Sequence, residues 1–424
     1  MANSNGGWKH RNTVFIILFI IWVTAYLDRM VMATAIPYIS DEFGLTPVAM
    51  GGVMSAFFVG YALCQIPGGL LADRFGAQKV MFSGIAWWSV FTAITGFANN
   101  LVHMLLVRVA FGVGEGIFPA ASYRTISNWF PAKDRGTATG LMMSSNAFGP
   151  ALAPLFVVAI MAAWGWRMVF YSLFIPGIIM CLLIKFFIPD NPADSKGISQ
   201  AELDELKEDH TEQTAQAKIS FWQIIKVPAV WRTFVSFFFF DITLWGFLSW
   251  LPSYLVKARG FEMTKMGITA SMPFFAGTAG VILFCWLSDK YFTHNRKMPV
   301  IITQIPGAIF LYLTFAVPDA TMAIICETLS GFFLYGAFGA LMALPMSSIS
   351  SEITGRAMGF VNMAGQIAGF LSPIIIGYLI QLAGGSFGTS FACLVGATVV
   401  SVLVTMTIKE DANKKEIHQE AVAE

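Results

Sequence analysis

Several charged side chains lie inside long apolar runs of the sequence, where a charge is costly unless it has a function. These residues are Asp28, Arg29, Arg108, Glu115 and Asp241, with Glu327 as a sixth candidate. A charge at the centre of a bilayer costs about 2.5–3.5 kcal/mol on insertion scales, so such residues usually face an interior cavity. We therefore treat them as candidates for substrate binding or ion coupling.

Arg29 has the side chain best suited to bind a carboxylate. A guanidinium stays charged at any relevant pH and can hold both carboxylate oxygens at once. Tyr26 precedes it by three residues, so its hydroxyl lies on nearly the same helix face and could join the contact. A structural ion pair of Arg29 with Asp28, or with a neighbouring helix, is the alternative.

Asp28 and Glu115 are the candidate proton carriers. Burial favours a neutral acid, whereas a nearby arginine favours the carboxylate. A carboxyl beside Arg29 or Arg108 could therefore alternate between the two forms, binding a proton when a substrate anion captures the arginine. Arg108 and Glu115 are seven residues apart, two turns along one helix face, which favours an indirect link between them. A purely structural role for either acid is the alternative.

The composition indicates what positions these residues. The chain has 424 residues, of which 56% are hydrophobic and only 12% charged, about half the charged share of a soluble protein. Apolar runs of roughly 20 residues recur, and each can cross a bilayer core as a helix. We predict an all-α membrane protein with twelve transmembrane helices. The expected spans lie near 13–39, 48–71, 80–98, 101–126, 136–163, 167–188, 230–256, 265–287, 299–317, 320–346, 357–382 and 387–408.

A charge-rich linker divides the chain into three parts. A six-helix bundle at 1–188 precedes the linker at 189–229, and a second six-helix bundle with a short tail follows at 230–424. Within the linker, Ser199 and Glu202 have the spacing of a capping box, which predicts a short surface helix. Lysine and arginine are concentrated in one set of loops, so we expect both termini in the cytoplasm.

The two bundles repeat one pattern in the same direction. Asp73 lies 36 residues after Pro37, and Asp289 lies 37 residues after Pro252. Both aspartates follow the second span of their half, which predicts two parallel six-helix repeats. We interpret Asp73, the adjacent Arg74 and Asp289 as gate elements, which could pair with arginines or helix dipoles. A role in topology and solvation alone is the alternative.

Two motifs carry a family resemblance. The stretch GLLADRFG at residues 69–76 resembles the signature loop between the second and third spans of the major facilitator superfamily, although Ala77 and Gln78 replace its usual basic pair. The stretch RVAFGVGE at 108–115 resembles that superfamily's fourth-span motif. Together with twelve spans, a parallel repeat and a central linker, the resemblance covers the whole chain.

Further motifs are similar to the anion:cation symporter branch of this superfamily. They are YLDR at 26–29, CQIPGG at 64–69, EGIFP at 115–119, NWFP at 128–131 and LWGFLSWLP at 244–252. The resemblance implies proton-coupled import of an organic carboxylate, such as an aldonate, aldarate or uronate, with H⁺ as the coupling ion and no cofactor. Tyr61, Asn146 and Asn362 match polar cavity positions of the branch, and an interhelical hydrogen bond is the alternative for each. The stretch GALMALP at 339–345 is less polar than in galactonate-type carriers, which favours a less hydroxylated acid.

Other classes of function are less consistent with the sequence. An exporter or antiporter of this fold would carry a glycine-rich fifth-span motif, which Gly140, Gly149 and Pro150 match only in part. A membrane sensor would want an appended soluble domain, and the termini are short. No catalytic constellation or metal-ligand cluster points to an enzyme, and a net charge of +1 gives no reason to expect nucleic acid. We expect a monomer in the bacterial inner membrane, whose partners are the lipid bilayer, a small organic anion and protons.

Overall fold

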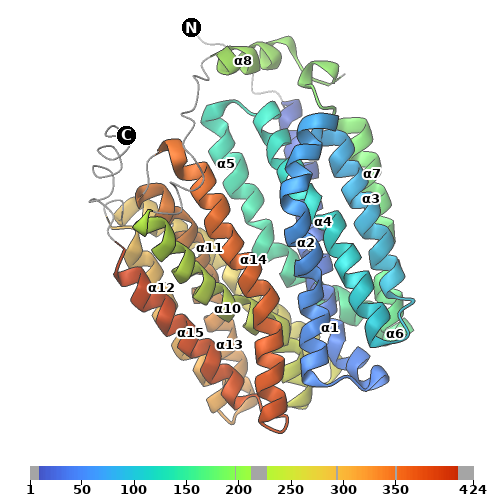
Figure 1. The fold of residues 1–424 in the computed structure, drawn as a ribbon, viewed down its shortest axis with the longest axis vertical. Coiled ribbons are helices and arrows are strands. Elements are labelled where there is room, and N and C mark those ends of the chain that lie inside the picture. The colour runs from blue at the N-terminus through green and yellow to red at the C-terminus, as the bar shows by residue number, and fades with distance from the viewer. Residues whose placement is uncertain (1–8, 196, 212–226, 293–294, 349–350, 409–424) are drawn as a thin grey trace. The chain divides into compact units, whose positions relative to one another are not determined.

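The computed structural model describes residues 9–195, 197–211, 227–292, 295–348 and 351–408 (Figure 1). Within these ranges the regular secondary structure is helical and no strand occurs, which confirms the all-α prediction. Part of the expected linker, 212–226, and the expected tail, 409–424, lie outside the described residues. The helices are α1 (His10–Phe43), α2 (Pro47–Phe75), α3 (Ala77–Thr95), α4 (Leu101–Trp129), α5 (Ala132–Met143), α6 (Ser145–Ser172), α7 (Phe174–Phe187), the 3₁₀ turn η1 (Pro192–Asp194), α8 (Gln200–Thr211), α10 (Pro228–Lys257), α11 (Met263–Tyr291), α12 (Lys297–Ala316), α13 (Ala320–Ser348), α14 (Ser351–Leu382) and α15 (Gly388–Met406).

The described helices account for the twelve expected spans. Ten helical segments are long and apolar enough to cross a membrane, and one of them, Ala132–Phe187, contains 56 residues. This segment is too long for a single crossing, and it breaks at Gly165, where φ is 78°. It therefore covers two expected spans, 136–163 and 167–188. The twelfth is α3, whose 19 residues reach about 28 Å at 1.5 Å per residue.

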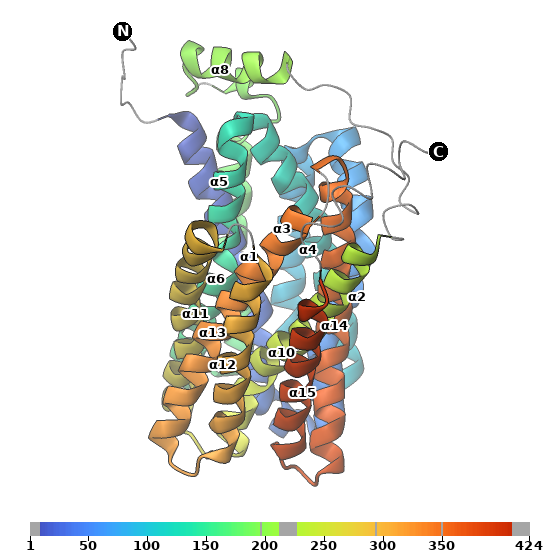
Figure 2. The ribbon, with the colours of Figure 1, turned by 90° about the vertical axis from the view of Figure 1, so that its left-hand side faces the viewer.

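By its contacts the chain divides into two compact units. The first contains Met1–Asp28, Val59–Gly149 and Arg167–Ala215, and the second contains Arg29–Phe58, Pro150–Trp166 and Gln216–Glu424. The boundary passes through α1, so Asp28 belongs to the first unit and Arg29 to the second. In the second unit α13 packs most extensively against α11 and α12, and Figure 2 shows these three helices side by side.

In the first unit, glycines let the backbones of α2 and α4 touch. A Cβ at Gly60 would lie 2.0 Å from the carbonyl oxygen of Val109, and one at Gly116 would lie 2.5 Å from that of Tyr61. Neither distance is possible for a real Cβ, so only glycine fits at these two positions. Small residues serve this purpose in membrane helices, where close packing replaces the missing hydrophobic drive for association.

The turn between α2 and α3 shows why the motif at 69–76 ends in glycine. Gly76 has a φ of 93°, a conformation that side-chain-bearing residues rarely adopt. Its neighbour Gln78 donates its backbone N–H to Asp190 Oδ1 at 2.7 Å. A Cβ at Gly76 would lie 2.2 Å from Asp190 Oδ2. The glycine thus allows the carboxylate that follows α7 to reach the first turn of α3.

The expected surface helix in the linker is present as α8, and it binds the start of α1. The backbone N–H of Glu202 donates to Ser199 Oγ at 3.3 Å, which confirms one half of the expected capping box. The other half was wrong, because the Glu202 carboxylate accepts instead from the backbone N–H groups of His10 and Arg11, at 3.2 and 3.0 Å. The first turn of α1 carries unsatisfied donors and a partial positive charge, and both attract a carboxylate.

Glu205 holds α8 to the same region through three cations. Its carboxylate accepts from Lys9 at 3.0 Å, from Arg11 at 2.8 Å and from Lys133 of α5 at 2.8 Å. Partial burial alone would raise the pKa of Glu205. The hydrogen bonds from Lys133 and Lys9 and the charge of Arg11 outweigh burial and lower the pKa from 4.5 to about 2.

Glu205→Gln is expected to loosen α8 at neutral pH. Because docking lowers the pKa of Glu205, its ionised form stabilises docking above about pH 4.5, and this contribution is lost as the pH falls toward about 2. After allowance for solvent screening we expect a loss of about 1 kcal/mol at most, or roughly fivefold faster hydrogen exchange of the α8 amides. Asp204→Asn on the same helix is the matched control, since Asp204 accepts from Gln200 of the same helix at 2.9 Å. Equal exchange in both variants would contradict the assignment.

Candidate functional site

Arg108 and Glu115 lie on one buried face of α4, as the sequence predicts. Arg108 is 3% exposed and Glu115 is 1% exposed. The same face continues through Phe118 to Ser122, at the three- and four-residue spacing of a helix stripe. The guanidinium of Arg108 lies over the ring of Phe111, 4.5 Å from its centre, one turn along the helix.

The register between α1 and α4 places Asp28 level with Glu115. The two helices run antiparallel, because Trp129 lies beside His10 with ring centres 5.5 Å apart, while Trp22 donates its Nε1–H to Ser122 Oγ at 2.9 Å. Asp28 comes six residues after Trp22, and Glu115 comes seven before Ser122. At 1.5 Å per residue, they therefore lie about 9 Å and about 10.5 Å beyond this contact along the helix axes. Asp28 is also buried, at 3% exposure.

Tyr61 on α2 is buried at the same level. Its carbonyl oxygen lies where α2 meets α4 at Gly116, the residue after Glu115. Tyr61 is 4% exposed. In the first unit, Asp28, Tyr61 and Glu115 thus lie at similar positions along the helix axes, and each comes from a different helix.

Tyr26 and Asn146 mark the approach of α1 to α6. A Cβ at Gly149 would lie 2.8 Å from the Cβ of Tyr26, so the two helices nearly touch there. Asn146 lies one turn before Gly149 and is half-buried. Tyr26 is buried, and its ring centre is 5.6 Å from that of Trp22.

Three further residues, which the sequence did not indicate as candidates, interact with the tyrosines and helices described above. Trp22 and Ser122 form the hydrogen bond that sets the register. The phenol of Tyr123 interacts electrostatically with those of Tyr26 and Tyr61. A possible signal was the spacing, since Ser122 and Tyr123 follow Glu115 by seven and eight residues on the same helix side. Polar residues are common in membrane helices, so this spacing alone was a weak signal.

Arg29 and Asn362 belong to the second unit. Arg29 is half-buried on α1, and its guanidinium lies 5.1 Å from the ring centre of Phe57 on α2. Asn362 is exposed on α14.

The three expected gate residues are exposed at helix ends, and both aspartates pair locally. Asp73 forms an ion pair with Arg124 of α4, in the same unit. Asp289 at the end of α11 accepts from Arg296 at 2.5 Å, just before α12. Arg74 lies over the ring of Phe75, 5.2 Å from its centre. Each aspartate therefore contacts an arginine of its own unit in this structure.

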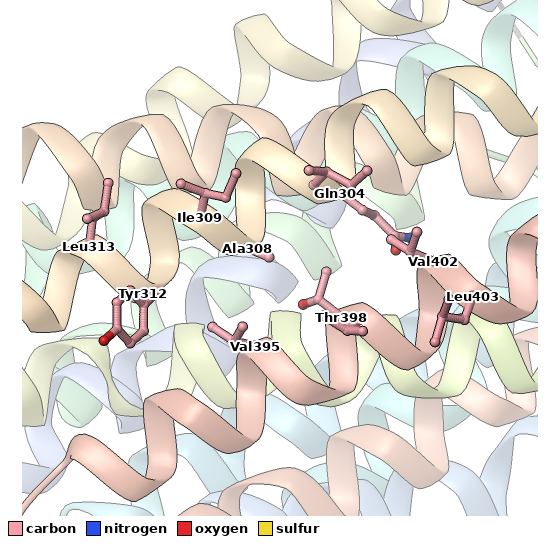
Figure 3. A pocket seen from close by; sticks show the side chains of 11 residues that line it. Gln304, Ala308, Ile309, Tyr312, Leu313, Val395, Thr398, Val402 and Leu403 are labelled. Atoms are coloured by element: carbon pink, nitrogen blue, oxygen red, sulfur yellow. The ribbon is translucent and has the colours of Figure 1, made fainter.

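A cavity of about 460 Å³ lies between α12 and α15 of the second unit (Figure 3). Its walls are almost wholly apolar, and Gln304, Thr398 and Tyr312 are the lining residues with polar groups. Ile309 and Tyr312 line it and are about half exposed, so it opens to the outer surface of these spans. A carboxylate would find no cation there, so this cavity is a poor anion site. Elsewhere in the described residues, His, Cys, Asp and Glu form no group of three or more suited to a metal ion.

Comparison with known proteins identifies the family to which this architecture corresponds. Residues 18–373 match the family model described as Major Facilitator Superfamily. The chain is 35% identical to a probable sulfoacetate transporter of Cupriavidus necator over 385 residues, 89% of each chain. It is 30% identical to a D-galactonate transporter of Escherichia coli, covering 96% of this chain and 97% of the relative. A hexuronate transporter of Bacillus subtilis is 28% identical over 94% of both chains.

Solved structures confirm the fold. A D-xylose–proton symporter matches with a TM-score of 0.77 at 15% identity, over 94% of this chain and 98% of that one. A bacterial homologue of the human lysosomal transporter Spinster, inward-facing and occupied, matches with a TM-score of 0.76 at 19% identity, over 94% and 96%. At these identities the likeness shows the fold alone.

Proposed function

The chain belongs to the Major Facilitator Superfamily, and we propose that this transporter imports a small organic carboxylate together with protons. The chain is a membrane transporter and not an enzyme. The observation that carries the proposal is the pair of buried acids, Asp28 and Glu115, which lie level with each other in the first unit. Such acids inside a membrane span are typical of proton pathways.

The relatives support an anionic substrate. Those named above carry sulfoacetate, galactonate or hexuronate, all of them small organic anions. In this chain the role of binding the carboxylate falls to Arg29, with Tyr26 and Tyr61 as hydroxyl partners. Asn146 and Asn362 would bind further polar groups. The segment at 339–345 includes Ala340, Leu341 and Leu344, all of them buried and apolar. This favours an acid with few hydroxyl groups.

Charge arithmetic explains why protons would be needed. An inside-negative potential opposes the entry of an anion by about 2.3 kcal/mol per charge per 100 mV. One proton per monovalent anion removes this opposition and leaves the pH gradient to drive uptake. Asp28 and Glu115 would carry the proton, and Arg108, on the face of Glu115, would favour its release. We further propose that both termini are cytoplasmic, since Lys9, Arg11 and Lys133 gather at one end of the first unit.

Acid outside is expected to drive uptake in proteoliposomes. With an imposed gradient of one pH unit, a one-proton symport can raise accumulation of a monovalent acid about tenfold, because one unit is worth about 1.4 kcal/mol per proton. Uptake of a panel of organic acids is measured with and without a protonophore, at clamped membrane potential. Uptake that is unaffected by the gradient and the protonophore would refute proton coupling. Absence of uptake for every carboxylate and sulfonate in the panel would refute the substrate class.

A further inference from the structure

Glu327 is a buried acid to which the proposed transport cycle assigns no role. It lies on α13 in the second unit and is 0% exposed. Within the described residues, neither carboxyl oxygen has a hydrogen-bond partner or an ion pair. An ionised carboxylate without partners is strongly disfavoured in a protein interior, so the form that fits this environment carries a proton.

The cation that interacts electrostatically with Glu327 is Arg259, whose hydrogen bonds go to other groups. Its Nη2 donates to the carbonyl oxygens of Thr314 and Val317 at 2.8 and 2.7 Å, and its Nη1 donates to that of Pro318 at 3.1 Å. These carbonyls are at the end of α12, where helix acceptors lack partners of their own. Arg259 therefore caps α12 while Glu327 stays unpaired.

Tyr254 hydrogen-bonds both to Arg259 and to the end of α12. Its hydroxyl accepts from Arg259 Nε at 2.6 Å and donates to the carbonyl oxygen of Thr314 at 2.8 Å. Arg259 and Tyr254 are the charged and titratable groups that interact with Glu327. Two other ionisable groups belong to helices that pack against α13. Lys265 of α11 lies over the ring of Phe261, and Tyr312 of α12 is about half exposed.

We propose that Glu327 is a proton-binding site of the second unit, and that its proton determines where Arg259 binds. With Glu327 protonated, Arg259 caps α12, as this structure shows. When the proton leaves, the carboxylate is the strongest partner available to the guanidinium, and Arg259 moves from the α12 carbonyls to Glu327. The proton is the ligand, and no other co-reactant is required.

The site adjoins a contact between α10 and α1. Lys257, two residues before Arg259, donates to Ser40 Oγ at 2.8 Å and pairs with Asp41 Oδ1 at 3.2 Å. All of these residues belong to the second unit. A shift of Arg259 would pull on the end of α10 that carries Lys257. Proton loss from Glu327 would therefore weaken the Lys257 contact with α1.

Infrared difference spectroscopy tests the proton directly. The full chain in lipid nanodiscs, without substrate, is taken from low to high pH while the carbonyl stretch of protonated carboxyl groups is recorded. Glu327→Gln is expected to lose one component of this band, and Asp241→Asn, the matched buried acid, is expected to retain that component. Glu327→Asp should restore it at a shifted frequency, which covers the case that the glutamine variant folds poorly. Identical spectra for Glu327→Gln and the parent would overturn the proposal.

Arg259→Ala tests the exchange of partners. Without the cation, Glu327 is expected to keep its proton to a higher pH. Arg296→Ala is the matched control, because Arg296 pairs with Asp289 at the other end of α11. An unchanged midpoint in Arg259→Ala would overturn the role of Arg259. No substrate takes part, so failure here leaves the proposed carboxylate transport untouched, and failure of transport leaves this result untouched.

Discussion

Arg29→Ala is expected to abolish substrate binding while the protein stays folded. Arg29 is the half-buried cation on α1 that our proposal assigns to the carboxylate, and removal of one partner from such a charge pair costs about 2–5 kcal/mol. This corresponds to roughly 30- to 5,000-fold in Kd. Arg29 is half-buried, so water can reach its position and the fold should tolerate the change. Its cation–π contact with Phe57 contributes about 0.5–2 kcal/mol. Stabilisation by substrate in a thermal-shift assay measures the loss.

Two further variants give this experiment its controls. Arg29→Lys keeps the charge but loses the two-pronged geometry, so its affinity should fall between those of the parent and the alanine variant. Arg232→Ala removes an arginine that donates to the carbonyl oxygen of Thr407 at the end of α15. It should bind normally. Undiminished stabilisation of Arg29→Ala by substrate would show that Arg29 does not hold the carboxylate.

Glu115→Gln is expected to separate exchange from accumulation. The amide imitates a permanently protonated acid in a position that is 1% exposed. Counterflow needs no net proton movement, so the variant should still exchange substrate. Uphill uptake should fail, because the empty carrier cannot release and rebind the coupled proton. An uncompensated anion then faces about 2.3 kcal/mol per 100 mV, which opposes accumulation roughly fiftyfold.

Asp28→Asn is the companion variant, and Glu262→Gln is the control. Asp28 adjoins Arg29, so loss of both exchange and accumulation in Asp28→Asn would indicate damage to binding rather than to coupling. Glu262 is exposed before α11, and its replacement should change neither activity. If Glu115→Gln accumulates substrate as well as the parent under the same gradient, Glu115 is only a structural partner. Asp28 is then the one remaining candidate proton carrier that we proposed in the first unit.

Much of the architecture could be predicted from the sequence because the bilayer restricts what a spanning segment can be. The spans near 101–126 and 320–346 differ from α4 (Leu101–Trp129) and α13 (Ala320–Ser348) by at most three residues at either end. Errors were larger where a helix continues into water, since apolarity ends before the helix does. A span was expected near 357–382, but α14 begins six residues earlier, at Ser351. Helical spacing also placed Arg108 and Glu115 on one face without any tertiary information.

The pairing of side chains could not be predicted in the same way. Glu202 has the spacing of a local capping box, yet its carboxylate binds the start of α1, which is 191 residues away from it at Arg11. Asp73 pairs with Arg124 of α4, and Asp190 binds the first turn of α3. A carboxylate binds the donors that packing brings closest, and several donors compete for each one. Their distances are set by helix crossings and glycine contacts that no local window contains.

By itself the sequence determined the class of the protein, the approximate positions of its spans and the short set of buried charges. Each of these follows from the cost of exposing polar groups to hydrocarbon, which acts on every residue separately. Only the tertiary structure decided that Asp28 lies level with Glu115 and Tyr61, that Tyr123 and Trp22 join them, and that Arg259 caps α12 beside an unpaired Glu327. These relations depend on the register between helices, and register is set by the packing of whole surfaces.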